Sequence, residues 1–428
     1  MSTDRPLYEH IDDVERLDYY RRGGYHPIQI GDRFQERYRI VHKLGYGSYS
    51  TIWLARDERM AKYVAIKVGT ADYGPKEAET LSRISASMVE SREFSSNLLP
   101  LVLDRFNVDG PNGTHPCLVT PPARCSLADA AQGPFPLHIA RSLSAQLAMA
   151  VAYIHKLGYV HGDLHMGNVL LQLPGLDLDR LSTKQLYDTF DSPDPEPVIR
   201  VDKQPLTSPG VPLYVYSPIW LREPGDEILL PEAKVLLADF GTAFCPTQES
   251  RFESYTPLQI RPPEARFEPT VSLSYASDIW SLGCMIWAIL GVRPFLDTWL
   301  FGPDDATADQ VDALGQMPDE WWETWEGRSK RFIANGTPKE GREVWTFNGR
   351  FEDAIQAPRR RRGTEVMCEE ERDALFEMIR GMLVFRPRDR LSASQVLGTQ
   401  WMRKWAIPEA ETTWGRKLLC DSRSSRCL

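Results

Sequence analysis

The spacing of apolar residues differs between two parts of this chain. Near the start they form short β-type runs, and further on they recur at helical spacing. The β-type runs are rich in β-branched and aromatic residues and are separated by glycine or charged residues. Strands are predicted at residues 38–44, 51–55, 63–68 and 117–120. A helix is predicted at 77–84, and helical spacing dominates from 136 to 405. We therefore predict an α+β fold with a small β-rich first lobe and a larger α-rich second lobe.

Breaks in these patterns predict the domain boundaries. The expected parts are an N-terminal extension at 1–24, a first lobe at 25–120, a second lobe at 121–406 and a C-terminal tail at 407–428. A polar, proline-rich interval at 174–231 has weak periodicity and indicates an insert in the second lobe, partly ordered by the apolar stretch at 211–220. A second insert is expected at about residues 300–350 of that lobe.

Composition and charge narrow the class of protein. The 428 residues are 42% hydrophobic and 25% charged, which is typical of a globular chain. No apolar stretch approaches the roughly 20 residues that a membrane span needs, and the start lacks the pattern of a secretory signal. A formal charge of −9 disfavours nucleic acid as a direct partner and favours a basic one. We expect a cytoplasmic or nuclear protein with no membrane partner; its oligomeric state stays open.

A glycine-rich hairpin between two predicted strands is the first candidate site. Gly45 and Gly47 would let backbone N–H groups approach phosphate oxygens, although an ordinary glycine turn has the same pattern. One strand later, Val-Ala-Ile-Lys ends at Lys67, which is the pattern of a lysine that neutralises nucleotide phosphates. A helix glutamate is expected to steer this lysine. We predict Glu79, with Glu77 as the alternative that spacing does not exclude.

Two further motifs follow the hairpin and the lysine. His-Gly-Asp-Leu-His-Met-Gly-Asn places Asp163 five residues before Asn168, and an apolar strand leads into Asp-Phe-Gly at Asp239. The four motifs in this order resemble those of eukaryotic protein kinases. The resemblance implies the two-lobed kinase fold, with ATP and Mg²⁺ as cofactors. It also implies that Asp163 accepts the proton of the substrate hydroxyl and that Asn168 and Asp239 bind the metal.

The loop departs from the common kinase pattern at two positions. Gly162 replaces an arginine that binds a phosphorylated activation loop in many kinases, and His165 replaces a lysine that approaches the γ-phosphate. The loop also resembles that of aminoglycoside and choline phosphotransferases, which phosphorylate small hydroxyl compounds. A small-molecule phosphotransferase and a catalytically weak pseudokinase scaffold therefore remain alternatives.

Three downstream residues favour a protein kinase over a small-molecule kinase. Glu264 ends an Arg-Pro-Pro-Glu run that resembles the close of the protein-kinase activation segment. Asp278 lies in a run resembling the buried helix whose aspartate anchors the catalytic loop, and Arg390 resembles the arginine that pairs with the Glu264 equivalent. A buried glutamate without that arginine would be costly, so the pair is expected together.

Other segments resemble the SR-protein-specific kinases in their fungal form. These are residues 20–27, residues 30–38, Ser50 in place of a third glycine, and the run 51–54. The resemblance implies a serine/threonine kinase that phosphorylates serines in basic arginine/serine-rich proteins and so regulates mRNA splicing. In that family an acidic groove docks the substrate, and it lies in an insert after the helix that corresponds to Asp278. Acidic residues cluster in the corresponding place, where a solvated acidic face is the alternative: Asp304, Asp305, Asp309, Asp312, Asp319, Glu320, Glu323 and Glu326.

The kinase resemblance also implies the adenine pocket. Leu44, Ile52 and Ala65 should line it, with Thr120 as gatekeeper. The hinge is expected to bind adenine through the Pro121 carbonyl and the Ala123 N–H, since proline has no N–H to donate. The complete nucleotide-binding set is Leu44, Gly45, Gly47, Ser50, Ile52, Ala65, Lys67, Glu79, Pro121 and Ala123.

Overall fold

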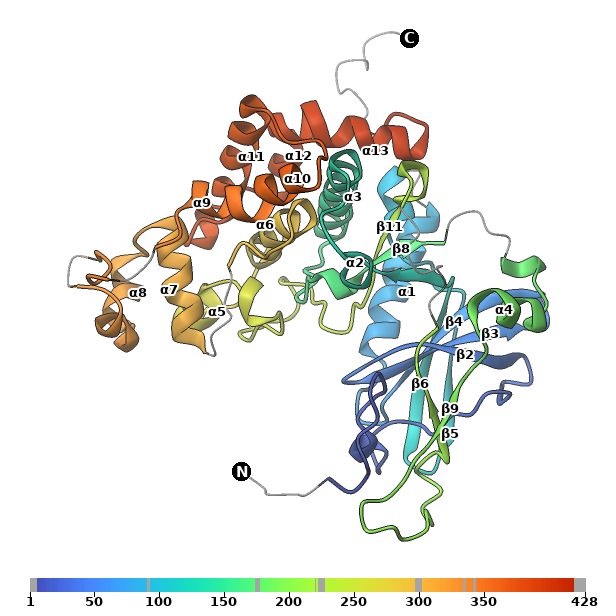
Figure 1. Ribbon diagram of the computed structural model, residues 1–428. Coiled ribbons are helices and arrows are strands. Elements are labelled where there is room, and N and C mark those ends of the chain that lie inside the picture. The colour runs from blue at the N-terminus through green and yellow to red at the C-terminus, as the bar shows by residue number, and fades with distance from the viewer. Residues whose placement is uncertain are drawn as a thin grey trace. The chain divides into compact units, whose positions relative to one another are not determined.

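The computed structural model describes most of the chain as two compact units (Figure 1). The described residues are 6–90, 93–173, 178–219, 221, 228–296, 302–333, 336–341 and 344–418. Unit 1 comprises Met1–Glu90, Pro100–Cys125 and Gln172–Glu227. Unit 2 comprises Ser91–Leu99, Ser126–Leu171 and Ile228–Leu428. The β-rich first part and helical second part confirm the predicted two-lobed α+β kinase fold.

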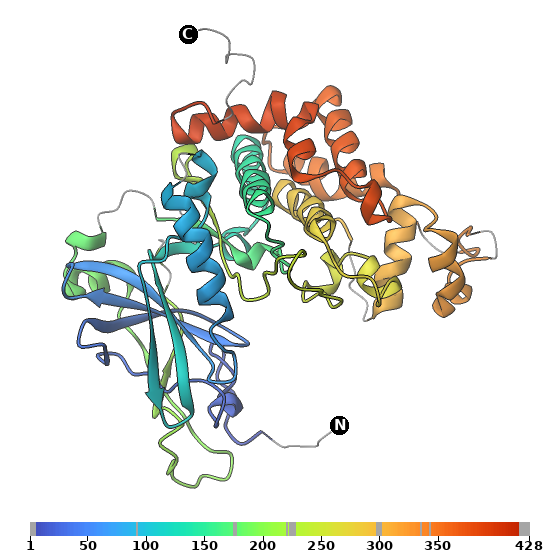
Figure 2. The ribbon, with the colours of Figure 1, turned by 180° about the vertical axis from the view of Figure 1, so that it is seen from behind.

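Unit 1 is built on an antiparallel six-stranded sheet in the order β1-β2-β3-β4-β6-β5. Its strands are β1 Arg33–Phe34, β2 Tyr38–Gly47, β3 Ser50–Asp57, β4 Lys62–Gly69, β5 Asp104–Gly110 and β6 Gly113–Thr120. All four predicted strands are present, and β1 and β5 are additions that the sequence analysis missed. Helix α1 Lys76–Glu90 lies beside β6 (Figure 2), and β7 Ala123–Ser126 follows that strand. One sheet face buries an aromatic and aliphatic core that includes Trp53, Ile66 and Val119.

The insert expected in the second lobe groups instead with the sheet of unit 1. Its elements are η4 Leu178–Arg180, α4 Thr183–Phe190, β9 Pro195–Pro197 and the antiparallel β10 Tyr214–Tyr216. Leu186 and Phe190 share a buried cluster with Val41 and Leu54 of the sheet, and the Ile219 N–H donates to the Lys43 carbonyl (2.8 Å). The cause is the burial of apolar side chains against the sheet, which is favourable regardless of where these residues lie along the chain. Residues 174–177, 220 and 222–227 lie outside the described residues.

Unit 2 is mainly helical, as predicted. Its helices include α2 Leu127–Ala130, α3 Leu137–Lys156, α5 Glu264–Phe267, α6 Tyr275–Leu290, α7 Pro303–Leu314, α8 Asp319–Thr324, α9 Phe347–Phe351, α10 Ala357–Arg361, α11 Glu369–Met382, α12 Ala393–Gly398 and α13 Ile407–Trp414. The helices α3 and α6 are buried over most of their length and form the centre of this unit. Strands β8 Val169–Gln172 and β11 Val235–Leu237 pair antiparallel. In the described part of the chain, no helix is both long and apolar enough to cross a membrane.

Two parts of unit 2 clarify the sequence interpretation. Trp321, Trp322 and Trp325 of the expected 300–350 insert are buried in one cluster, so this segment packs as part of the core of unit 2. The expected tail begins instead with a packed helix: in α13 Ile407 and Ala410 are buried against α3. Residues 419–428 lie outside the described residues.

Candidate active site

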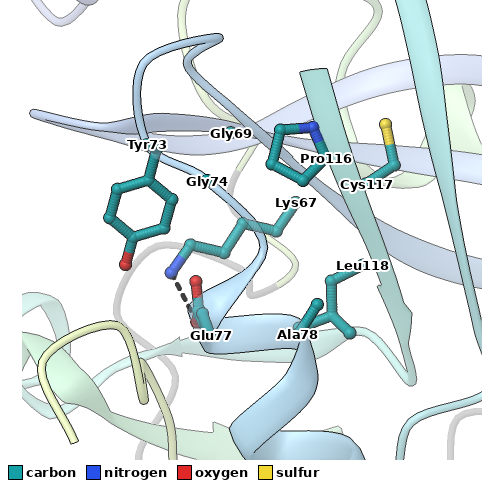
Figure 3. Close-up of a pocket in the computed structure, with 9 residues that line it drawn as sticks. All are labelled: Lys67, Gly69, Tyr73, Gly74, Glu77, Ala78, Pro116, Cys117 and Leu118. Carbon is teal, nitrogen blue, oxygen red and sulfur yellow. Dashed lines mark hydrogen bonds and ion pairs between the residues drawn. The ribbon is translucent and has the colours of Figure 1, made fainter. Parts of the chain in front are cut away.

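The amine of Lys67 pairs with Glu77 of α1, not with the predicted Glu79. The Lys67 Nζ to Glu77 Oε1 distance is 2.7 Å, and Figure 3 shows the two side chains pointing toward one another. Glu77 is buried because it lies on the helix face of Leu81 and Ile84, at spacings of four and seven residues. Glu79 lies two residues on, about 200° around the helix. The alternative named in the sequence analysis is therefore the correct partner.

This pairing predicts different effects for two neighbouring substitutions. Glu77→Gln should lower kcat/KM for ATP about tenfold, because the lysine loses a charge-assisted hydrogen bond that holds its amine in place. Glu79→Gln, the matched control on the same helix, should stay within about twofold of wild type. Steady-state kinetics with varied ATP measures both. Equal effects at the two positions would contradict the role of Glu77.

Strand register places the predicted adenine-pocket residues on one face of the sheet. Ile52 and Leu118 are both register partners of Lys67, and Ala65 is the partner of Thr120. Directly opposed residues on neighbouring strands point to the same face of a sheet, and so do residues two positions apart on one strand. All five of these side chains therefore share the face opposite the aromatic core.

The remaining predicted residues adjoin that face. The hairpin continues from it, since Gly45 pairs with Ile52 and Gly47 with Ser50. Pro121 follows β6, and Ala123 begins β7. Leu44 packs in part against the separate cluster that contains Val41.

A small hollow lies beside the Lys67–Glu77 pair within unit 1 (Figure 3). The space between its walls, part of which is open to solvent, is about 270 Å³. Its walls come from β4, the loop after it, the start of α1, and β6: Lys67, Gly69, Tyr73, Gly74, Glu77, Ala78, Pro116, Cys117 and Leu118. The charged pair therefore borders open space.

Unit 2 brings Asp163, Asn168 and Asp239 together. The Asn168 side-chain amide donates to the Asp163 carbonyl (2.9 Å), and the Ala238 N–H donates to the Asn168 carbonyl (2.8 Å). Asp239 therefore follows directly from a strand bonded to the catalytic loop, and it has a left-handed φ of 63°. That conformation is rare for residues other than glycine and is a form of backbone strain that concentrates at functional sites.

The Asp163 carboxylate is suited to accept a proton. Among the described residues, none hydrogen-bonds to its buried Oδ1 atom. Burial raises the pKa of Asp163, against the lowering influence of His165 and His161. A carboxylate with a raised pKa is a better general base near neutral pH than an ordinary one.

Asp278 anchors the catalytic loop, as the resemblance implied. Its carboxylate accepts from the backbone N–H groups of His161 (2.7 Å) and Gly162 (3.0 Å), and it lies 2.9 Å from His155 Nε2. Although burial works to raise it, the net pKa of Asp278 is lowered by the hydrogen bond and charge of His155. Gly162 has φ of 80°, and an added Cβ would lie 3.1 Å from the Thr242 carbonyl, so the fold favours glycine there.

Two further side chains, His165 and Arg251, lie in or near the catalytic loop. Burial lowers the pKa of His165, whose Nδ1 accepts the Gly167 N–H (3.1 Å), so this imidazole is neutral at pH 7 and supplies no cation. Arg251 was not predicted. Its guanidinium donates to the Thr242 carbonyl (2.6 Å) and lies 5.1 Å from the Phe244 ring centroid. No sequence motif marked Arg251, because only the folded segment brings it to Thr242.

The Glu264–Arg390 pair is present and buried. Two bonds join the carboxylate and the guanidinium, at 2.7 and 2.6 Å, and the two side chains are 6% and 0% exposed. The same guanidinium donates to the carbonyls of Ala276, Val384 and Phe385 (2.9, 2.7 and 2.9 Å). The pair therefore ties three segments of unit 2 together.

Most carboxylates of the acidic cluster on α7, α8 and η7 Glu326–Lys330 form ion pairs with arginines of unit 2. Five of its eight carboxylates pair with arginines: Asp304 with Arg266, Asp305 with Arg331, Asp309 with Arg350, Glu320 with Arg386 and Glu323 with Arg328. An arginine-rich ligand would compete with these guanidinium groups for the carboxylates. The cluster is therefore mainly an ion-pair network of the fold.

Comparison with known proteins defines the class. The protein kinase domain family matches residues 38–178. A serine/threonine protein kinase of Aspergillus fumigatus is 27% identical over 400 residues, which cover 91% of this chain and 90% of that protein. Together with the fold and the site, these findings show that the chain is a serine/threonine protein kinase, as the sequence predicted.

Two further relatives are also protein kinases. The serine/threonine-protein kinase SRPK of Physarum polycephalum is 27% identical over 413 residues, 91% of each chain. Protein kinase dsk1 of Schizosaccharomyces pombe is 34% identical over 188 residues, 42% of this chain and 34% of that protein. The chain is therefore similar to kinases of this kind over most of its length, which confirms the resemblance seen in the sequence.

A protein kinase uses ATP with a divalent metal, and the described residues fit both. Asp239 and Asn168 offer carboxylate and amide oxygens, which are suitable ligands for a hard cation. An added Cβ at Gly47 meets no atom within 4 Å, so the hairpin backbone is open to a phosphate.

Proposed function

We propose that this kinase transfers the γ-phosphoryl group of ATP to serines of arginine/serine-rich proteins, with Mg²⁺ as its metal. The observation that carries the proposal is the similarity to a kinase named SRPK over 91% of both chains. The formal charge of −9 agrees with a basic substrate. The internally paired acidic cluster gives no support, so the proposal rests on the similarity and on the site.

The proposed mechanism assigns one role to each site residue. When bound, ATP and Mg²⁺ supply the phosphoryl group and neutralise phosphate charge. Lys67, held by Glu77, positions the phosphates, and Asn168 and Asp239 hold the metal. Asp163 orients the serine hydroxyl and accepts its proton, aided by the burial that raises its pKa.

The test is phosphate transfer from labelled ATP with Mg²⁺ to four acceptors in parallel. These are an arginine/serine-repeat peptide, a lysine/serine peptide of the same length, choline and an aminoglycoside. We expect selective labelling of the arginine/serine peptide. Equal labelling of both peptides would remove the arginine/serine specificity, and labelling of only a small molecule would remove the protein substrate.

The raised pKa of Asp163 predicts the acid limb of the pH profile. The ionised carboxylate is the active base, so kcat/KM should fall as the pH decreases through the pKa of Asp163. This decrease should be centred above about 3.9, the ordinary aspartate value. Initial rates across a pH series at constant ionic strength measure it. A flat profile down to the ordinary value, with the fold intact by circular dichroism, would contradict the assignment.

A further inference from the structure

An N-terminal strap at residues 7–24 packs onto unit 1, where the sequence predicted only an extension. The strap lies beside the insert (Figures 1 and 2). The Glu9 N–H donates to the Ile199 carbonyl (2.9 Å), and the Val201 N–H donates to the Leu7 carbonyl (3.0 Å). Apolar side chains of both segments share one cluster: Tyr8, Ile11, Val14, Leu17, Tyr19, Tyr20, Val198, Leu206, Val211 and Val215. The strap and the insert therefore stabilise each other.

A buried ion pair fixes the middle of the strap to the strand that leads into the glycine hairpin. Glu15 of the strap pairs with Lys43 of β2, and both side chains are at most 1% exposed. The Tyr20 hydroxyl donates to the same carboxylate. Removing one partner of such a pair would leave an uncompensated buried charge, so the strap is firmly attached at this point.

Tyr25 follows the strap and reaches the glycine hairpin itself. Its hydroxyl donates to the Gly47 carbonyl (2.7 Å). The residue is 3% exposed, and its ring centroid lies 5.5 Å from that of Tyr20. The Asn112 side-chain amide donates to the carbonyls of both Tyr25 and Gly210, at 2.7 Å each. The backbone of Tyr25 is thus held by the sheet and the insert, and its hydroxyl holds the hairpin.

The opposite side of the hairpin is held by different groups. The Thr70 N–H donates to the Tyr49 carbonyl (2.8 Å), and the Tyr49 ring stacks on Tyr73 at 5.6 Å. Tyr73 lines the hollow beside Lys67. Three contacts from outside the hairpin therefore restrict its tip, one at Gly47 and two at Tyr49, although Gly47 and its neighbours are exposed.

We propose that Tyr25 is a positioning residue for ATP, and that its hydroxyl presets the glycine hairpin to receive the phosphates. This inference rests on the proposed role of the hairpin in phosphate binding. A glycine-rich segment loses much conformational freedom when it closes on a ligand. A hairpin already held at Gly47 loses less on binding, which increases affinity for the part of the ligand that it contacts. Burial, with the charge of Glu15, raises the pKa of Tyr25 to about 12, so the hydroxyl stays a donor at neutral pH.

The experiment compares Tyr25→Phe with a matched control in the full chain. Tyr187→Phe removes another tyrosine hydroxyl that donates to a β2 carbonyl, that of Val41 (2.8 Å), away from the hairpin. Calorimetry with ATP and Mg²⁺, and separately with adenosine, measures binding without turnover. We expect Tyr25→Phe to weaken ATP about three- to tenfold, the worth of one neutral hydrogen bond, and adenosine less than twofold. Tyr187→Phe should leave both affinities unchanged.

A second measurement on the same proteins is hydrogen exchange, which should accelerate at amides 45–50 in Tyr25→Phe alone. The proposal is overturned if Tyr25→Phe binds ATP as wild type does, if ATP and adenosine weaken equally, or if the two variants behave alike. Because binding is measured instead of transfer to a peptide, failure of the arginine/serine substrate assignment would leave this result intact.

Discussion

Asp163→Asn should reduce kcat about 10²- to 10⁴-fold, the range in which general bases contribute to catalysis. The amide keeps the size of the carboxylate but cannot accept the serine proton. Because Asp163 is assigned to the hydroxyl and not to the nucleotide, the affinity for ATP should stay within about twofold of wild type. Single-turnover transfer to an arginine/serine peptide, with ATP binding measured separately, tests both parts.

The stability of this variant separates a chemical effect from misfolding. The pKa of Asp163 is raised in the folded chain, so the ionised side chain is disfavoured by folding at neutral pH. Asn carries no charge, and the melting temperature should therefore be equal to or higher than that of wild type. Asp373→Asn, at an exposed position of α11, is the control and should retain full activity. Retained transfer in Asp163→Asn would remove the residue from the proposed mechanism.

Arg390→Ala should lower the free energy of unfolding by about 3–5 kcal/mol, the typical cost of breaking a buried pair. The substitution leaves the Glu264 carboxylate buried without its guanidinium and removes the donor of three backbone carbonyls. Urea unfolding followed by tryptophan fluorescence measures the loss, since Trp280 lies 5.0 Å from the Arg390 guanidinium.

Arg386→Ala is the matched control for this prediction. Arg386 also makes two bonds to a glutamate, Glu320, but that pair is exposed and should contribute little. A double variant, Glu264→Leu with Arg390→Met, should recover part of the loss, because apolar residues remove the unpaired charge. Equal unfolding midpoints for the two single alanine variants would show that burial of the pair does not determine its contribution.

The sheet and the catalytic motifs could be predicted because their signals are local. Alternating β-branched runs define β2, β3 and β4, and the spacing from Asp163 to Asn168 lies within one loop. The choice between Glu77 and Glu79 depended on the helix face. That signal was present, since Glu77 continues the 4-3-4 spacing of Leu81, Ile84 and Met88, all buried.

The position of the insert was not predictable in the same way. Ser182 and Gln185 form a capping box, and Leu186 and Phe190 have helical spacing, so the short helix α4 had a sequence signature. Nothing local shows which surface its apolar side chains cover. Burial against Val41 and Leu54 joins residues more than a hundred positions apart, and this kind of contact is set only by the assembled fold.

The discontinuity of unit 1 determines the order in which a growing chain can complete it. The sheet strands lie within residues 33–120, but the segments that cover Val41 and Leu54 come from residues 178–219. Residues 126–171, which belong to unit 2, are synthesised between them. At about 5–20 residues per second, the ribosome synthesises these covering segments several seconds after the sheet strands. During this interval the nascent sheet exposes apolar residues that the finished enzyme buries, and the strap has no insert to pair with.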